Sequence, residues 1–177
     1  MKFGLRFVFL MMCLIATINV ADAQLSDVRI GVNGLTCSQC TRNVEMSLRK
    51  LNFVQDVEMD LQHTEGKITL KANSRFDPEA IVDAIKAAGF STRFLTATID
   101  FSAISLLDNT CFLLNEDSYR IVPTPTSKLS DVRVVRFIGK NYLPHGELKK
   151  WAAKFAEMNC IAKRTNHYLI TLQSAPQ

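Results

Sequence analysis

Cys37 and Cys40 stand three positions apart, and they are the residues of this 177-residue sequence whose type and spacing best suit chemistry. The C-x-x-C pattern occurs in thiol-disulfide redox motifs, in zinc sites and in sites for soft metal ions, so the spacing alone leaves all three open. The pair lies where a short loop gives way to a helical pattern. Unpaired N–H groups at the start of a helix favour thiolate over thiol, so we expect two soft anions near the surface.

The residues around the pair narrow the choice of chemistry. Residues 24–95 hold no second Cys or His pair at zinc-finger spacing, so they cannot by themselves build a closed four-ligand zinc site. Thiolate ligands instead select soft ions, Cu(I) first, with Hg(II), Cd(II) or Ag(I) as alternatives. In an oxidising compartment the two cysteines would also form a plain disulfide, and this structural alternative stays open.

The elements that must position the pair follow from the spacing of apolar residues over residues 24–95. Alternation predicts strands over 28–33, 56–61, 67–72 and 90–95, and spacings of three and four predict helices over 38–51 and 78–88. The second helix is marked at both ends, by Asp77 as N-cap, by Pro78 at the first helical position and by Gly89 as C-cap. The order β-α-β-β-α-β is the ferredoxin-like arrangement, an α+β fold with both helices on one face of the sheet.

The loop and its frame resemble the heavy-metal-associated domain family over about residues 26–94. The resemblance is carried by Gly34-Leu35-Thr36-Cys37-Ser38-Gln39-Cys40, followed by Val44, Leu48, the hairpin, Ala84-Ile85 and Gly89-Phe90. The family includes copper chaperones and a periplasmic mercury-binding protein. The resemblance implies that Cys37 and Cys40 hold Cu(I) and that a partner's cysteines take the ion by stepwise ligand exchange.

Two positions depart from the family pattern. Leu35 stands where the family usually has a Met that packs inward, so we expect Leu35 to be buried. Phe90 stands where members often have Tyr or Lys, so we expect the metal loop to lack a nearby hydroxyl or ammonium group.

The first 23 residues have the pattern of a cleavable secretory signal peptide. Lys2 and Arg6 precede an apolar run over residues 7–16, and Ala21-Asp22-Ala23 gives the A-x-A cleavage pattern. The run is shorter than the roughly 20 apolar residues that cross a bilayer. We therefore expect cleavage after Ala23, export to the periplasm or the extracellular space, and no stable membrane insertion afterwards.

Residues 96–177 are predicted to form a second, small α+β domain, and the sequence assigns it no role. Its strand-like segments are 99–105, 110–114, 119–122, 132–138 and 168–172, and a helix is predicted over 144–159. Cys111 and Cys160 are expected to form a disulfide, because a domain of about 80 residues gains from such a cross-link. A second soft-metal site, with Met158 as a further donor, is the alternative for these cysteines.

The sequence favours a binding protein over an enzyme. The formal net charge of +4 comes without a run of basic residues, which argues against a dedicated nucleic-acid binder. No nucleophile with a base and no phosphate loop is evident, so we expect no catalytic activity. We expect an exported protein that binds Cu(I), and either buffers it or transfers it to a transporter or cuproprotein. The alternatives are a thiol-disulfide oxidoreductase or redox sensor, a mercury-scavenging protein, and a pure interaction module.

Overall fold

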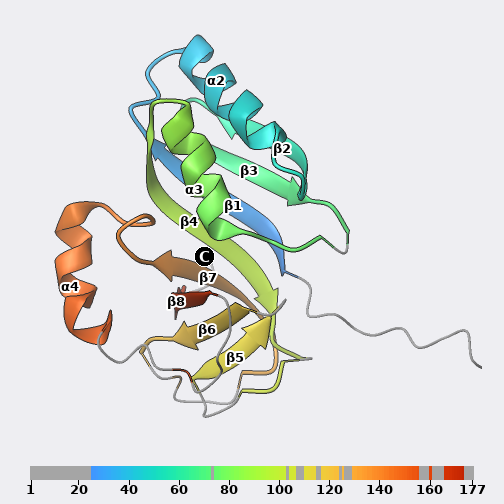
Figure 1. The fold of residues 1–177 in the computed structure, drawn as a ribbon, viewed down its shortest axis with the longest axis vertical. Coiled ribbons are helices and arrows are strands. Elements are labelled where there is room, and N and C mark those ends of the chain that lie inside the picture. Colours follow the sequence, from blue (N-terminus) through green and yellow to red (C-terminus); the bar gives the residue numbers. More distant parts are fainter. Residues whose placement is uncertain are drawn as a thin grey trace, which may run out of the picture.

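The structure, a computed structural model, describes residues 25–72, 74–102, 104–106, 110–114, 117–123, 125, 129–155, 160 and 166–173. These residues form one eight-stranded sheet with the order β2-β3-β1-β4-β7-β8-β6-β5 (Figure 1). The predicted signal peptide, residues 1–23, lies outside the described residues. Within the described part of the chain, none of the helices has the length and apolar character needed to span a bilayer.

The first half of the sheet has the predicted ferredoxin-like order. Its elements are β1 (Leu25–Asn33), α2 (Ser38–Arg49), β2 (Val54–Asp60), β3 (Glu65–Leu70), α3 (Pro78–Ala87) and β4 (Ser91–Asp100). β1 is central and pairs antiparallel with β3 on one side and with β4 on the other. Helices α2 and α3 lie side by side on one face of these strands (Figure 1), which confirms the α+β prediction.

The ends of α3 are fixed by the residues that the sequence singles out. The Asp77 carboxylate accepts the backbone N–H groups of Glu79, at 3.0 Å, and of Ala80, at 3.1 Å. Pro78 occupies the first helical position, where no N–H is needed. Gly89 adopts a φ of +89°, the left-handed conformation that ends a helix and that glycine adopts without steric cost.

The second half extends the same sheet from the edge of β4. Its elements are β5 (Cys111–Leu114), β6 (Asp117–Ile121), β7 (Val132–Ile138), α4 (His145–Phe155) and β8 (His167–Leu172). β7 pairs antiparallel with β4, β8 pairs antiparallel with β7 and parallel with β6, and β5 pairs antiparallel with β6. The predicted domain boundary between residues 95 and 96 falls inside β4, so the division into two domains stays a prediction.

The strand predicted over residues 99–105 is wrong beyond Asp100. The side chain of Asp100 accepts the N–H of Ser102 at 2.9 Å, and the N–H of Ile104 donates to the carbonyl of Phe101 at 3.2 Å. These local hydrogen bonds turn the chain away from the sheet. The apolar residues in this segment serve the core from a loop, since Phe101 is fully buried. The predicted helix over 144–159 is present as α4 (His145–Phe155), and residues 156–159 lie outside the described residues.

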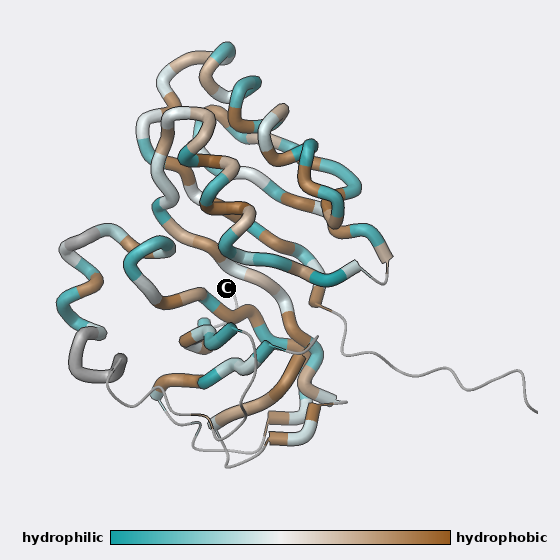
Figure 2. The backbone as a smooth tube through the Cα atoms, in the orientation of Figure 1, coloured by the Kyte–Doolittle hydropathy of each residue, from teal (hydrophilic) through white to brown (hydrophobic). Residues whose placement is uncertain are grey.

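The two halves place their helices on opposite faces of the sheet. Phe137 of β7 and Ile170 of β8 belong to the same core as the buried residues of α2 and α3. Their chain neighbours Ile138 and Leu169 point to the other face, because successive side chains of a strand alternate. There Trp151 of α4 packs against Ile138 and Leu169. Figure 2 shows that apolar residues recur along the strands of both halves.

One aromatic contact chain joins the halves across the α3 face. Phe76, which precedes α3, lies 6.1 Å from Phe53 and 6.0 Å from Phe137, measured between ring centroids. Phe137 also contacts Tyr119 at 6.3 Å and Tyr168 at 5.9 Å. Edge and tilted arrangements at these distances are favourable for aromatic rings. The core is therefore continuous between the residues before α3 and the strands of the second half.

Replacing Phe137 tests whether the two halves share this core. The fully buried ring is lost in Phe137→Ala, so we expect the free energy of unfolding to fall by about 3–5 kcal/mol. Val132→Ala on the same strand is the control, because Val132 is 59% exposed and its loss should cost less than about 0.5 kcal/mol. Urea denaturation followed by Trp151 fluorescence and circular dichroism measures both. Two separate unfolding transitions, of which only one shifts to lower urea concentration in Phe137→Ala, would contradict a shared core.

Candidate functional site

The loop between β1 and α2 carries the C-x-x-C pair at the end of the central strand. Gly34 begins the loop with a φ of +86°, a conformation that a side chain would disfavour. Leu35 then turns inward and is 4% exposed, which confirms the expectation that it is buried. With Leu35 as an anchor, the next three residues, Thr36, Cys37 and Ser38, are exposed.

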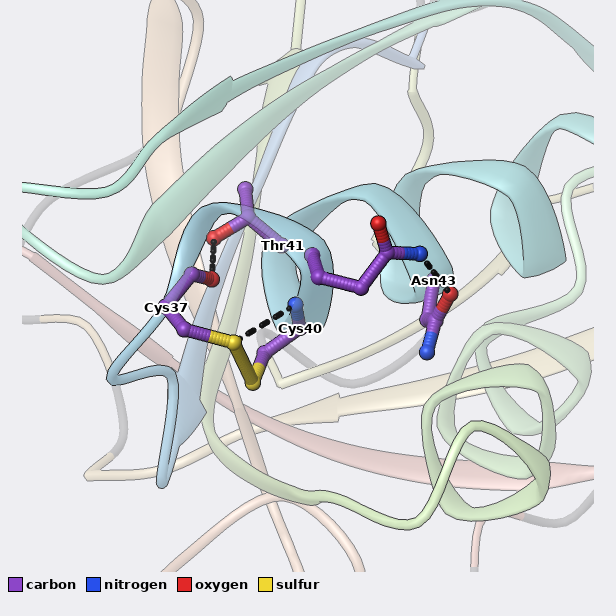
Figure 3. Close-up of a disulfide and its surroundings, with 5 residues drawn as sticks. Cys37, Cys40, Thr41 and Asn43 are labelled. Carbon is purple, nitrogen blue, oxygen red and sulfur yellow. Dashed lines mark hydrogen bonds between the residues drawn. A yellow bond between two sulfur atoms is a disulfide. The ribbon is translucent and has the colours of Figure 1, made fainter.

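Cys37 is the N-cap of α2, and its sulfur takes the role of the capping acceptor. Its backbone is extended, and Sγ accepts the N–H of Cys40 at 3.1 Å (Figure 3). The carbonyl of Cys37 accepts both the backbone N–H and the hydroxyl of Thr41, each at 3.1 Å. The first turn of α2 contains no acidic residue. An N–H donor and the positive end of a helix thus face the sulfur, and both favour its anionic form.

Cys40 lies one turn further along α2, with its Cα 5.2 Å from that of Cys37. The two cysteines form a disulfide in this structure (Figure 3). Cys37 is exposed, whereas Cys40 is partly buried and packs against the main core. The structure therefore holds the oxidised state of the pair, and two-electron reduction would give two neighbouring thiols of unequal exposure.

The turn after α3 lies beside the C-x-x-C loop. The Asn33 side chain donates to the Ser91 hydroxyl at 3.3 Å, and these two residues pair between β1 and β4. A Cβ built on Gly34 would lie 3.7 Å from the ring of Phe90, which also packs against the core. The side chain next to Gly34 on this side is thus the hydrocarbon ring of Phe90.

Among the described residues, sulfur atoms alone form the donor set around the pair. Within the part of the chain that the structure describes, no group of three or more His, Cys, Asp or Glu residues is close enough to share a metal ion. The exposed His63 ring contacts Asp60 at 2.7 Å, and this carboxylate raises the pKa of His63. His167 is exposed, and the side chain of His145 lies outside the described part of the structure. Two thiolates without further ligands suit Cu(I) or Hg(II), which accept a pair of sulfur donors.

Cys111 and Cys160 form the second disulfide, which confirms the sequence prediction. Their Cα atoms lie 6.0 Å apart, and the residues are 1% and 8% exposed. This burial leaves no access for an ion from solvent, which argues against the alternative of a second soft-metal site. Met158, the further donor in that alternative, lies outside the described residues.

The sequence did not single out two residues that support the site, Thr41 and Arg49. Thr41 binds the Cys37 carbonyl, and Arg49 binds residues on α2 and β2. Arg49 donates to Glu45 at 2.7 Å, to the side chain of Asp56, and to the carbonyl of Val57 at 2.6 Å. These bonds hold α2 against β2, and the guanidinium keeps the pKa of the Glu45 and Asp56 carboxyls below their usual range. The i, i+4 spacing of Glu45 and Arg49 indicates their ion pair from sequence alone. The bonds from Arg49 to β2 depend on how the chain folds.

Comparison with known proteins identifies one family. The heavy-metal-associated domain family matches residues 29–91, which include the C-x-x-C pair. The chain is 33% identical over 64 residues to the copper chaperone CopZ of Staphylococcus haemolyticus (strain JCSC1435), covering 36% of this chain and 93% of the chaperone. It is 27% identical over 113 residues to the probable copper-transporting ATPase HMA5 of Arabidopsis thaliana, covering 60% of this chain and 10% of the ATPase. The chain therefore spans only a small part of the ATPase.

Among solved structures, oxidised MerP from Ralstonia metallidurans CH34 is similar. It is 22% identical with a TM-score of 0.36, over 39% of this chain and 94% of that protein.

The difference in exposure predicts that the two disulfides respond differently to reductant. A short treatment of the folded protein with a water-soluble phosphine should free Cys37 and Cys40 and leave Cys111 and Cys160 bonded, because only the first pair is accessible. Alkylation with iodoacetamide followed by peptide mass spectrometry identifies the modified residues. The same treatment in denaturant is the control and should label all four cysteines. Equal labelling of both pairs in the folded protein would contradict the assigned exposure.

Proposed function

The chain belongs to the heavy-metal-associated domain family, and we propose on that premise that its reduced Cys37–Cys40 pair binds one soft metal ion, Cu(I) in the first place. The observation that carries the proposal is the position of the pair. Both sulfurs lie at the first turn of α2, Cys37 is exposed, and the Cys40 N–H faces the Cys37 sulfur. Soft thiolates in such a place suit a monovalent soft cation.

The unequal exposure of the two sulfurs gives ligand exchange an order. An incoming thiolate reaches the ion on the side of Cys37, since Cys40 is partly buried against the core. A new metal–sulfur bond forms to the partner, the bond to Cys37 breaks, and the second exchange then releases Cys40. The ion keeps its oxidation state throughout, and the protons lost by the partner's thiols pass to the released cysteine sulfurs. Transfer thus needs no catalytic residue, and we propose a carrier, not an enzyme.

Loading requires that the disulfide is first reduced. A thiolate of a small thiol or a dithiol protein attacks the exposed Cys37 sulfur and forms a mixed disulfide with it, while Cys40 leaves as a thiolate. A second thiolate of the reductant then attacks the reductant sulfur that is bonded to Cys37, and Cys37 leaves as a thiolate. The two electrons come from the reductant, which becomes a disulfide. Metal binding is therefore linked to the thiol redox poise of the compartment.

Copper is the proposed ion because a copper chaperone and a copper-transporting ATPase are among the relatives. The proposed partner is a transporter or cuproprotein that presents its own thiolates. Hg(II) is the second candidate, because two thiolates suit it equally well. A thiol-disulfide oxidoreductase is the other alternative, favoured by the exposed disulfide itself.

We also propose that the chain is exported. Residues 1–23 would act as the signal peptide, and residues 24–95 and 96–177 would form the metal-binding domain and a C-terminal domain. An exported location fits the two disulfides, because oxidising compartments allow such bonds to persist.

Metal titration of the reduced protein tests the proposed function. Reduced wild-type protein should bind about one Cu(I) per chain, because the pair supplies two thiolates to one ion. Cys37→Ser and Cys40→Ser should each abolish this binding when measured anaerobically by competition with bathocuproine disulfonate. The thiol count is taken first, and a parallel titration with Hg(II) ranks the two ions. Serine is also a good N-cap, so Cys37→Ser keeps the start of α2 intact.

Ser38→Ala is the matched control, because Ser38 is exposed between the two cysteines and its loss leaves both thiols in place. This variant should bind the ion as the wild type does. Copper binding that survives Cys37→Ser would refute the assigned site. Rapid reduction of insulin disulfides by a protein that ignores copper would favour the oxidoreductase instead.

The mature N-terminus tests the proposed export. Protein recovered from the exported fraction should begin at Gln24, and Ala23→Arg should block cleavage, because signal cleavage needs a small residue at that position. Mass spectrometry of the exported and retained fractions gives the result. Exported protein that still begins at Met1 would contradict the proposal.

A further inference from the structure

Helix α3 is tied to the turn that follows β7 at two points along its length. The Asn141 side chain donates to the Glu79 carboxylate at 2.8 Å and accepts from the Lys86 ammonium at 3.4 Å. The Tyr142 hydroxyl donates to the other oxygen of Glu79 at 2.5 Å. Glu79 and Lys86 lie seven residues apart, about two helical turns. Two adjacent residues of the second half thus hold most of the length of α3.

The turn that makes these contacts is itself held in place. The N–H groups of Tyr142 and Leu143 both donate to the carbonyl of Gly139, at 3.0 and 3.1 Å. The Tyr142 ring is buried, with its centroid 5.5 Å from that of Phe137. Burial and the Glu79 carboxylate both raise the pKa of Tyr142, so its hydroxyl stays protonated and able to donate. The turn is therefore a fixed support for α3.

The far end of α3 leads into the turn that lies beside the C-x-x-C loop. The helix ends at Ala87 with Ala88 as its C-cap, and after Gly89 the N–H of Phe90 donates to the carbonyl of Ile85 at 3.1 Å. This bond places the ring of Phe90 relative to the helix, and the ring lies next to Gly34. A shift or rotation of α3 would therefore move Phe90 against the loop that holds Cys37.

We infer that Asn141 and Tyr142 are positioning residues for the Cys37–Cys40 site, acting through α3 and Phe90. This inference rests on the proposed function of the pair, and it gives the second half of the chain a role in that function. The two residues fix α3, so that Phe90 stays packed beside Gly34 and the loop keeps its two sulfurs together. Without them α3 gains freedom, Phe90 loosens, and the loop holds the chelating geometry less well.

The double variant Asn141→Ala/Tyr142→Phe tests the inference in the full mature chain. It removes all three side-chain hydrogen bonds to α3 and keeps the buried ring, so the protein should fold. We expect Cu(I) to leave the protein about fivefold faster towards bathocuproine disulfonate, a typical size for coupling through a packed helix. Alkylation of Cys37 by iodoacetamide in the reduced, metal-free protein should accelerate by a similar factor.

Arg133→Ala is the matched control. It removes a hydrogen bond of 3.0 Å between Arg133 and Asp131 at the start of β7, where Arg133 pairs with Ile99 of β4. This variant should leave both rates unchanged. The single variant Tyr142→Phe should show a smaller effect of the same sign as the double variant.

The rates of Cu(I) loss and of Cys37 alkylation together distinguish a failure of the inference from a failure of the proposed function. A change in both rates in the double variant, and in neither for the control, supports the inference. A double variant that is less stable but keeps both wild-type rates overturns it, because the bonds would then be purely structural. If the wild type binds no copper, the proposed function fails, and the alkylation rate alone then decides whether the turn controls the loop.

Discussion

The start of helix α2 is the feature on which the proposed chemistry depends. Helix N-termini carry N–H groups without intrahelical partners, and here a sulfur occupies the position in which serine or aspartate oxygens usually accept them. The Cys40 N–H therefore contacts Cys37 Sγ. In the proposed function the same position would serve the disulfide, the thiolate and a metal-bound sulfur, because each can accept the N–H.

The frame around this start keeps the pair at the surface. Leu35 is inserted into the core on one side of the cysteines, and Val44 and Leu48 bury the inner face of α2 on the other. Both anchors are apolar, so the loop between them is held without covering Cys37. The exposed Cys37 and the partly buried Cys40 follow from this arrangement, and the proposed order of ligand exchange rests on their difference.

The second half of the chain completes the sheet at an edge that would otherwise be unpaired. β7 hydrogen-bonds along β4, and Phe137 meets Phe76 across the α3 face. The buried Asp117 carboxylate also pairs with Arg75 at 2.8 Å, just before α3. These contacts come from residues far apart in sequence, and they tie the segment before α3 to the C-terminal strands.

The sequence by itself determined the local features: the strand and helix order of residues 25–95, the N-cap Asp77, the left-handed Gly89 after α3 and the C-x-x-C pair. Each depends on side-chain types a few residues apart, which periodicity and backbone preference reveal. Only the tertiary structure decided that β4 continues to Asp100 and pairs with β7, that α4 lies on the opposite face, and that Asn141 contacts Glu79. These features depend on which distant strands pair, and the alternation of apolar residues in a strand specifies a buried face but not the neighbour at its edge.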